Sequence, residues 1–443
     1  MPGHTHPTST TTRPRHASGT DEGRVDGRIA ESGRRAASAG AVLRAVLDHG
    51  PIARSTIARI TGLSPASVTG HSSGLTRLGL LRELPGEVRS NGLGRPHVPV
   101  DIDTSQHLVA AVHIAVRWTT TALLDLRGRV LARSLTLHES TDPAAVVEHA
   151  ARSLDALYTA HAERGGDARP LGIGVATGGW VDPEAGVVMD HPRLGWSLVP
   201  LRDRLAERTG LPVRVDGHSR ALLHGEVLFG QASTAGSVLH VFVGNVVDAA
   251  FATRGEAHYG SRAQAGAIAH LPVEGSREPC SCGRIGCLEA AVSEHTLTRR
   301  AHEQGIIPAL DIRLLLDAAS AGNEAAVEIF VERARLVGRA VAMLMDVFGP
   351  EIAIVMEPSL PRLPSALAAL RSAARENVRT VCDVDKVLIP TSFPGRVLET
   401  AGGAVFLDAL YRNPLAFEGR ISDRLANGIN LEDCNVDTTG LLR

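Results

Sequence analysis

Three of the five cysteines in this 443-residue chain lie within eight positions of one another, and a histidine lies ten residues before the first of them. The four residues are His270, Cys280, Cys282 and Cys287. Thiolate sulfur and imidazole nitrogen are the ligands that tetrahedral Zn²⁺ prefers, and one histidine with three cysteines completes a closed site. Four protein ligands leave no position for water. The pattern therefore predicts one structural zinc ion per chain, which holds the loop in shape and does no chemistry.

The alternatives for this cluster are a disulfide pair with a bystander cysteine, or chance clustering. Gly283 and Gly286 favour the metal, because glycine allows the tight backbone turns that bring Cys282 and Cys287 to one ion. The N-terminus lacks the apolar core of a secretory signal, and disulfides are typical of secreted proteins. No apolar run approaches the roughly 18 residues of a membrane span. We therefore expect a cytoplasmic protein without a membrane partner.

Charge is unevenly distributed along the chain. The net charge is −2, but the first 100 residues contain 13 arginines and 7 acidic residues, whereas the other 343 contain 33 basic and 41 acidic residues. A basic N-terminal segment followed by an acidic remainder of the chain is typical of a nucleic-acid-binding domain attached to a second module. Residues 1–37, which have almost no large apolar side chains, are expected to be a disordered basic tail. Such a tail is also the alternative explanation of the charge.

The elements that follow this tail, within residues 39–103, indicate how the arginines are positioned. A first helix has its apolar residues at positions 42, 43, 46 and 47, and a second, short helix covers 55–60. A third begins at Ser64-Pro65, with an N-cap followed by proline at the first helical position. Residues 82–100 are suited to a hairpin. Three short helices followed by a hairpin predict a winged helix-turn-helix.

In this motif the third helix enters the major groove of DNA, with its N-terminal residues towards the base edges. Small and polar side chains on that helix permit close approach, and nearby arginines would contact phosphates. The candidate DNA-binding residues are Ser64, Ser67, Thr69, His71, Ser73, Arg77, Arg89 and Arg95. The expected partner is a double-stranded DNA operator. The alternative is a small helical subdomain used for dimerisation.

Residues 106–415 alternate apolar, β-rich runs with helical patterns, which is typical of an α/β fold. The predicted strands are 107–116, 120–125, 171–176, 213–215, 238–243, 248–254, 352–356 and 387–389, and the longer predicted helices are 144–161 and 325–348. They form two groups, so we expect two lobes, about 106–232 and 233–415, with a ligand cleft between them. The zinc loop, 270–289, belongs to the second lobe. Residues 416–443 are expected to be a C-terminal tail.

Several motifs together resemble those of the ROK family, which comprises bacterial sugar kinases and sugar-responsive transcriptional repressors. The resemblance covers about residues 39–415. Its motifs are Cys280-x-Cys282-Gly-x-x-Gly-Cys287-x-Glu289, Gly178-Gly179 with Val181-Asp182, Leu194-Gly195-Trp196 and, after the winged helix, Gly94-Arg95-Pro96. The last of these, with the winged helix, is typical of the regulator branch. The resemblance implies a two-lobed ribonuclease-H-like, actin-like ATPase fold behind the winged helix-turn-helix.

The residues that a ROK kinase would need are replaced in this chain. The family's first phosphate loop, Asp-x-Gly-x-Thr, corresponds to His113-Ile-Ala-Val-Arg, without the carboxylate that helps to hold magnesium. The glycine-rich second loop corresponds to residues 244–250, where three glycines are lost and Asp248 would repel phosphate. The catalytic aspartate corresponds to His218. The resemblance therefore implies a body that is not an enzyme. An ATP-dependent sugar kinase with an added DNA-binding domain is the alternative.

The sugar site implied by the resemblance is also partly changed. The family's Glu-x-Gly-His motif reads Ala267-Ile-Ala-His270, so one sugar-binding carboxylate is lost, whereas His270 and Glu289 remain. The candidate effector-binding residues are Asp216, His218, His270 and Glu289; for His218, an ordinary helix-face residue is the alternative. We predict a repressor of sugar or carbon-metabolism genes that forms a homodimer or homotetramer and senses a sugar or sugar phosphate. A body that only dimerises, without a ligand, stays an alternative.

Overall fold

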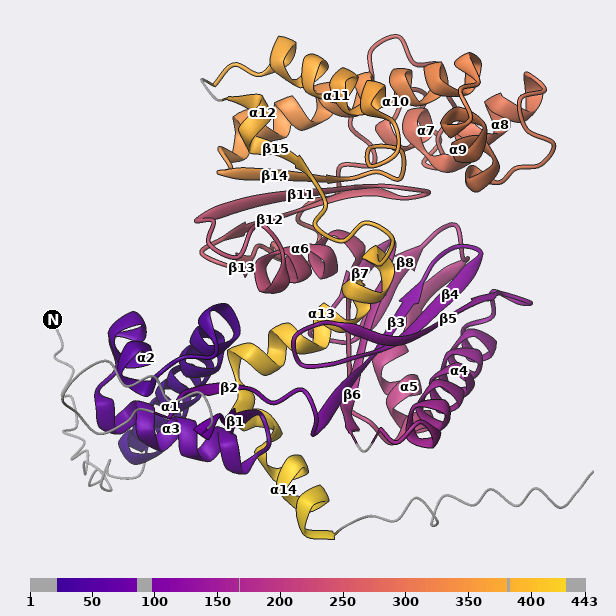
Figure 1. The fold of residues 1–443 in the computed structure, drawn as a ribbon. Coiled ribbons are helices and arrows are strands. Elements are labelled where there is room, and N and C mark those ends of the chain that lie inside the picture. Colours follow the sequence, from indigo (N-terminus) through magenta and orange to yellow (C-terminus); the bar gives the residue numbers. More distant parts are fainter. Residues whose placement is uncertain (1–21, 86–97, 167, 381–382, 428–443) are drawn as a thin grey trace, which may run out of the picture.

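The computed structural model of the chain describes residues 22–85, 98–166, 168–380 and 383–427. The described chain has three parts: a winged helix near the N-terminus and two lobes, each built on a five-stranded sheet (Figure 1). Among the described residues, no helix is both long enough and apolar enough to cross a membrane. The α/β class and the two-lobed body predicted from the sequence are confirmed.

The N-terminal part follows the predicted order of helices. Helix α1 spans Glu22–His49, α2 spans Arg54–Thr61 and α3 spans Pro65–Arg77. Gly62 ends α2 in the left-handed conformation, with a φ of 71° that glycine adopts without a Cβ clash. The side chain of Ser64 accepts a hydrogen bond from the amide of Ser67 and so caps α3.

The inner face of α3 and a short sheet complete this domain. Val68 and Leu75 of α3, and Leu78 directly after the helix, are buried in one cluster with Leu43 of α1. Strand β1 (Leu81–Glu83) pairs with β2 (Val100–Ile102) in antiparallel register. Residues 86–97 of the connection between them lie outside the described residues, and so do the predicted contacts Arg89 and Arg95.

One part of the expected N-terminal tail is helical. Helix α1 begins at Glu22, so residues 22–37 belong to this helix, and the expectation of disorder for them is wrong. The physical reason is that these residues include many good helix formers, Ala, Arg and Glu, which extend a helix already held by the buried Val42 and Leu43. Residues 1–21 lie outside the described part of the chain.

Lobe 1 is a mixed sheet with helices on both faces. Its strand order is β10-β6-β3-β4-β5. The strands are β3 (His107–Ile114), β4 (Trp118–Leu124), β5 (Val130–Leu137), β6 (Arg169–Thr177) and β10 (Val213–Gly217). Helices α4 (Pro143–Glu163) and α5 (Leu201–Thr209) pack on one face, where Val146 and Leu205 share a core with Val112. A small sheet, β7 (Trp180–Asp182), β8 (Val187–His191) and β9 (Trp196–Val199), adjoins this lobe.

Lobe 2 repeats the strand arrangement of lobe 1. Its order is β13-β12-β11-β14-β15, with the three strands β11, β14 and β15 parallel and the β11-β12-β13 side antiparallel. The strands are β11 (Ser237–Val243), β12 (Val247–Thr253), β13 (Glu256–Ala257), β14 (Ile352–Met356) and β15 (Leu388–Pro390). The helices are α7 (Leu288–Val292), α8 (Glu294–Glu303), α9 (Ile312–Ser320), α10 (Glu324–Phe348), α11 (Pro364–Asn377) and α12 (Val384–Val387).

Two helices fill the space between the lobes and the winged helix (Figure 1). Helix α6 spans His218–Phe229 and α13 spans Val397–Arg412. Helix α13 packs on the lobe 1 sheet so closely that the backbones of α13 and β6 are in contact. A Cβ added to Gly174 of β6 would lie 2.0 Å from the carbonyl oxygen of Gly402. The expected end of lobe 2 at residue 415 is therefore wrong, because α13 returns to lobe 1.

The C-terminal region also departs from the expected tail. A 3-10 helix, η2 (Pro414–Phe417), and helix α14 (Glu418–Asn427) continue the chain after α13. Phe417 and Ile421 are buried in the same cluster as Leu43 and Leu75 of the winged helix. These apolar residues recur at helical spacing, and their burial keeps the segment packed. Residues 428–443 lie outside the described residues.

Candidate functional site

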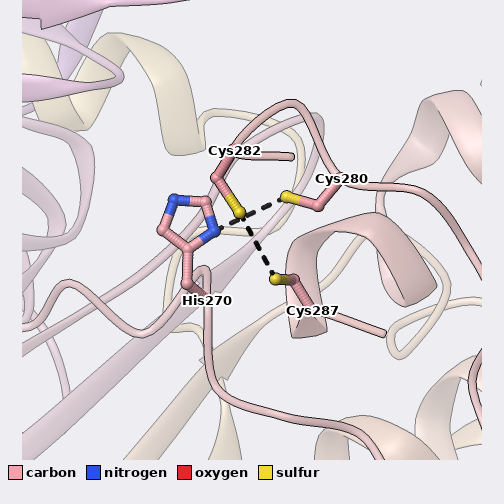
Figure 2. Close-up of side chains that lie close together, drawn as sticks. All are labelled: His270, Cys280, Cys282 and Cys287. Atoms are coloured by element: carbon pink, nitrogen blue, oxygen red, sulfur yellow. Dashed lines mark hydrogen bonds between the residues drawn. The ribbon is translucent and has the colours of Figure 1, made fainter. Parts of the chain in front are cut away.

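The predicted metal ligands come together in the loop between β13 and α7 (Figure 2). The ligand atoms of His270, Cys280, Cys282 and Cys287 all lie within 4.8 Å of one another. The Cys282 and Cys287 sulfurs are 3.7 Å apart, and His270 Nδ1 is 3.5 Å from Cys280 Sγ. Ligands at tetrahedral corners around Zn²⁺ would be separated by about 3.8 Å for two sulfurs and about 3.5 Å for sulfur and nitrogen. The four residues therefore form a cluster able to hold one metal ion.

Local backbone pairing explains how the loop gathers these residues. Pro279 bridges Ile285, and the amide of Cys280 donates to the carbonyl of Arg284 at 2.8 Å, so Cys280 and Cys282 lie on a tight turn. Gly283, at the tip, has a φ of 84°, which favours glycine. The three cysteines are free thiols, and a 3.7 Å separation is far beyond the roughly 2.05 Å of a disulfide. The disulfide alternative therefore does not describe this loop.

Electrostatics at the cluster favour a thiolate. Arg284 Nε donates a hydrogen bond to Cys282 Sγ at 3.5 Å. This bond lowers the pKa of Cys282 to about 6. Burial raises the pKa of the neighbouring Cys287 to about 11. Thiolate is the form that binds metal, so Cys282 is the cysteine best prepared for a cation.

A polar cavity of about 230 Å³ lies between the lobes, next to the metal cluster. Glu289 and His270, two of the four predicted effector-binding residues, line it. Glu289 accepts a hydrogen bond from the amide of Val247 at 3.2 Å, and Arg193 lies 3.9 Å away. Burial raises the pKa of Glu289 and outweighs the lowering by Arg193. The cavity thus offers carboxylate, imidazole and guanidinium groups to a polar ligand.

Asp248 and Ser219 are two further polar residues of this cavity that the sequence did not identify as ligand groups. The hydroxyl of Ser219 donates a short hydrogen bond to the Asp248 carboxylate. Burial raises the pKa of Asp248 to about 6 despite this bond. The two residues come from α6 and β12, so their sequence spacing carries no signal that they meet. From the sequence alone, Asp248 is expected only to repel phosphate.

The other two predicted effector residues do not line this cavity. Asp216 is buried behind it, where its carboxylate accepts a hydrogen bond from Arg220 Nε at 2.6 Å. Its pKa is lowered, because Arg220 and His224 outweigh the opposite effect of burial. His218 lines a second, larger cavity of about 740 Å³ in the same interlobe region. His191 lines both cavities, so the two are neighbours.

The predicted DNA contacts that can be placed lie along α3. Ser64, Thr69, Ser73 and Arg77 are exposed, and Ser67 and His71 are half-buried. The Ser64 oxygen is already occupied by the capping bond to the Ser67 amide. Among the residues described, α3 therefore presents a mostly small, polar outer face with one exposed arginine near its C-terminal end.

Comparison with known proteins agrees with this architecture. The ROK family model matches residues 109–396. A transcriptional regulator of Mycobacterium tuberculosis (strain H37Rv) is 34% identical over 412 residues, which covers 87% of this chain and 90% of that protein. The N-acetylglucosamine repressor of Escherichia coli O6:H1 is 28% identical, covering 77% of this chain and 86% of the repressor.

A solved structure shares the fold. The crystal structure of a ROK family transcriptional regulator, described as a homologue of the Escherichia coli MLC protein, superposes with a TM-score of 0.73 at 22% identity. The match covers 87% of this chain and 99% of that one. These findings define a two-lobed protein of the ROK fold with a winged helix in front. The chain belongs to the ROK family.

Proposed function

We propose that this protein is a DNA-binding transcriptional regulator, a repressor of sugar or carbon-metabolism genes that acts in the cytoplasm. The observation that carries the proposal is the capped helix α3, whose outer face is exposed and polar in a winged helix of the expected topology. The similarity to transcriptional regulators supports it, because the relative from Mycobacterium tuberculosis matches 87% of this chain and not the body alone.

The body senses a ligand and does not transfer phosphate. The amide of Gly244 donates to the carbonyl of Val246 at 3.0 Å, and the amide of Val247 donates to Glu289, so two amides of this loop are directed at protein acceptors. A phosphate cradle needs such amides to point at the ligand. His218, at the position of the family's catalytic aspartate, is buried, and desolvation holds its pKa well below its usual value. Both features argue against the kinase alternative.

The effector is a small sugar or sugar phosphate bound in the polar cavity beside the metal cluster. Glu289, Asp248 and Ser219, of which the first two are partly exposed, supply hydrogen-bonding groups of the kind that distinguish polyols. The metal is one structural Zn²⁺ per chain, because three thiolates and an imidazole fit this ion and leave no open position. A homodimer or homotetramer presents two winged helices to a palindromic operator.

The test is capture of genomic DNA fragments by the full-length protein, with the bound sequences identified. Enrichment of fragments near sugar-utilisation genes, and their release by a sugar or sugar phosphate, is the expected result. Absence of sequence-selective enrichment would overturn the regulator assignment. Sugar-dependent ATP hydrolysis that saturates with substrate would instead establish the kinase alternative.

A further inference from the structure

The larger interlobe cavity has no role in the proposed function. It has a volume of about 740 Å³, which is in the range of cavities that hold drug-sized molecules. Much of its wall is apolar and is supplied by both lobes and by α13. The wall includes Trp118 of β4, Phe242 of β11, Leu398 of α13 and the imidazole of His218.

The arginines that line the cavity are all paired with carboxylates. Arg133 lies 3.0 Å from Glu399, Arg313 lies 2.7 Å from Asp311, and Arg362 lies 3.1 Å from Asp317. Arg313 also lies over the ring of Trp118, with its guanidinium carbon 5.5 Å from the ring centroid. Cations already neutralised in this way give little attraction to a phosphate or carboxylate ligand. The cavity therefore favours an uncharged molecule.

The imidazole of His218 is a polar group that is able to make a further hydrogen bond. Its ring stacks on His113 with centroids 4.4 Å apart and contacts Phe242 at 4.9 Å. Neither ring nitrogen of His218 makes a hydrogen bond of ordinary geometry with the described protein groups; burial lowers its pKa, and the nearby backbone of Ile114 only opposes this effect. A buried polar group without a full partner costs about 1–3 kcal/mol. A ligand that hydrogen-bonds this imidazole would recover part of that cost.

We propose that this cavity is a second ligand site, which binds an uncharged, largely aromatic molecule through its apolar wall and through one hydrogen bond to His218. Ring systems suit the site because Trp118 and Phe242 offer aromatic surfaces at two places on its wall. The site is separate from the polar sugar cavity, although His191 borders both. It does not depend on the DNA-binding assignment.

The probe for this site is Nile red, an uncharged aromatic dye with a carbonyl acceptor whose fluorescence rises in apolar surroundings. Titration of the full-length protein with the dye is expected to give saturable binding, with one site per chain and micromolar affinity. Leu398→Trp, which fills the cavity, should weaken binding at least tenfold. Ala267→Trp, the matched substitution in the polar cavity, should leave it unchanged.

His218→Phe keeps the ring and removes the hydrogen bond, so a roughly fivefold loss of affinity is expected, in line with about 1 kcal/mol for one neutral hydrogen bond. Circular dichroism and thermal denaturation establish that each variant is folded. Non-saturable dye binding by folded protein would overturn the proposal, as would equal affinity in the Leu398→Trp variant. Displacement of the dye by MgATP as effectively as by an uncharged aromatic competitor would contradict the uncharged ligand class.

Discussion

The imidazole of His224 on α6 lies 3.3 Å from the carboxylate of Asp408 on α13, so a buried ion pair joins these two helices. On its other side, His224 Nε2 lies 3.7 Å from Asp216 and 3.3 Å from the hydroxyl of Tyr259. Arg412 pairs with the same Asp408 at 2.7 Å. The charges alternate in sign along this row, which links lobe 1, the interlobe helices and the residues just ahead of η2.

The first prediction concerns the pH dependence of stability. Burial alone would lower the pKa of His224, but Asp408 and Asp216 outweigh it and raise the pKa to about 9. A pKa raised on folding gives stability that is complete below the unfolded value of about 6.5 and is lost as pH rises through about 9. The free energy of unfolding should therefore fall by a few kcal/mol between pH 6.5 and 9.5.

Urea denaturation at several pH values measures this loss. In His224→Gln the protein should be less stable at pH 6.5, and its stability should vary less over the same range. His258→Gln, which removes an exposed histidine, is the control and should keep the pH profile of the native protein. An unchanged profile in His224→Gln would contradict the assigned ion pair.

The second prediction concerns the metal. Freshly purified protein should contain one zinc ion per chain by elemental analysis, and Cys282→Ser should lose it. Because a structural metal contributes directly to folding, a strong chelator or Cys282→Ser should destabilise lobe 2 by several kcal/mol. Cys434→Ser, a substitution in a cysteine far along the chain, should change neither zinc content nor stability. A zinc-free protein of native stability would exclude the structural role.

The third prediction concerns DNA. Arg77→Ala should weaken binding to a captured genomic fragment and reduce the slope of log affinity against log salt by about 1, as expected for one lost phosphate contact. Arg214→Ala, an exposed arginine on β10, is the matched control. Substitution is preferable to deletion of the winged helix, because Leu43 packs with Leu410 and Tyr411 and deletion would uncover that core. Equal slopes of log affinity against log salt for the two variants would show that Arg77 does not contact a DNA phosphate.

The fourth prediction concerns the contact between α13 and the lobe 1 sheet. Gly174→Ala places a Cβ 2.0 Å from the carbonyl oxygen of Gly402, where backbone must move, so a destabilisation of about 3 kcal/mol or more is expected. Gly33→Ala in α1 meets nothing within 4 Å and should stabilise the helix by up to about 1 kcal/mol. Thermal denaturation of both variants checks the pair. Similar melting temperatures of the two variants would show that the backbones of α13 and β6 are not in close contact.

The features that the sequence predicted well are local ones. The start of α3 follows from Ser64-Pro65, because a cap and a proline act within one helical turn. The metal cluster follows from ligand types within one loop. The position of α13 could not be predicted, because strand and helix periodicity does not indicate which sheet a late helix packs on. The same limit applies to Asp248 and Ser219, which meet only through the tertiary fold.

Helix α13 has a further consequence for how the molecule can work. Its first turn contributes Leu398 and Glu399 to the wall of the larger cavity, and its last turns contribute Leu410 and Tyr411 to the core beneath α1. Sixteen residues of α-helix make a rod about 24 Å long. Because the cavity wall and the support of the winged helix are two ends of one rod, a tilt at one end displaces the other by leverage, without any relay of side chains between them.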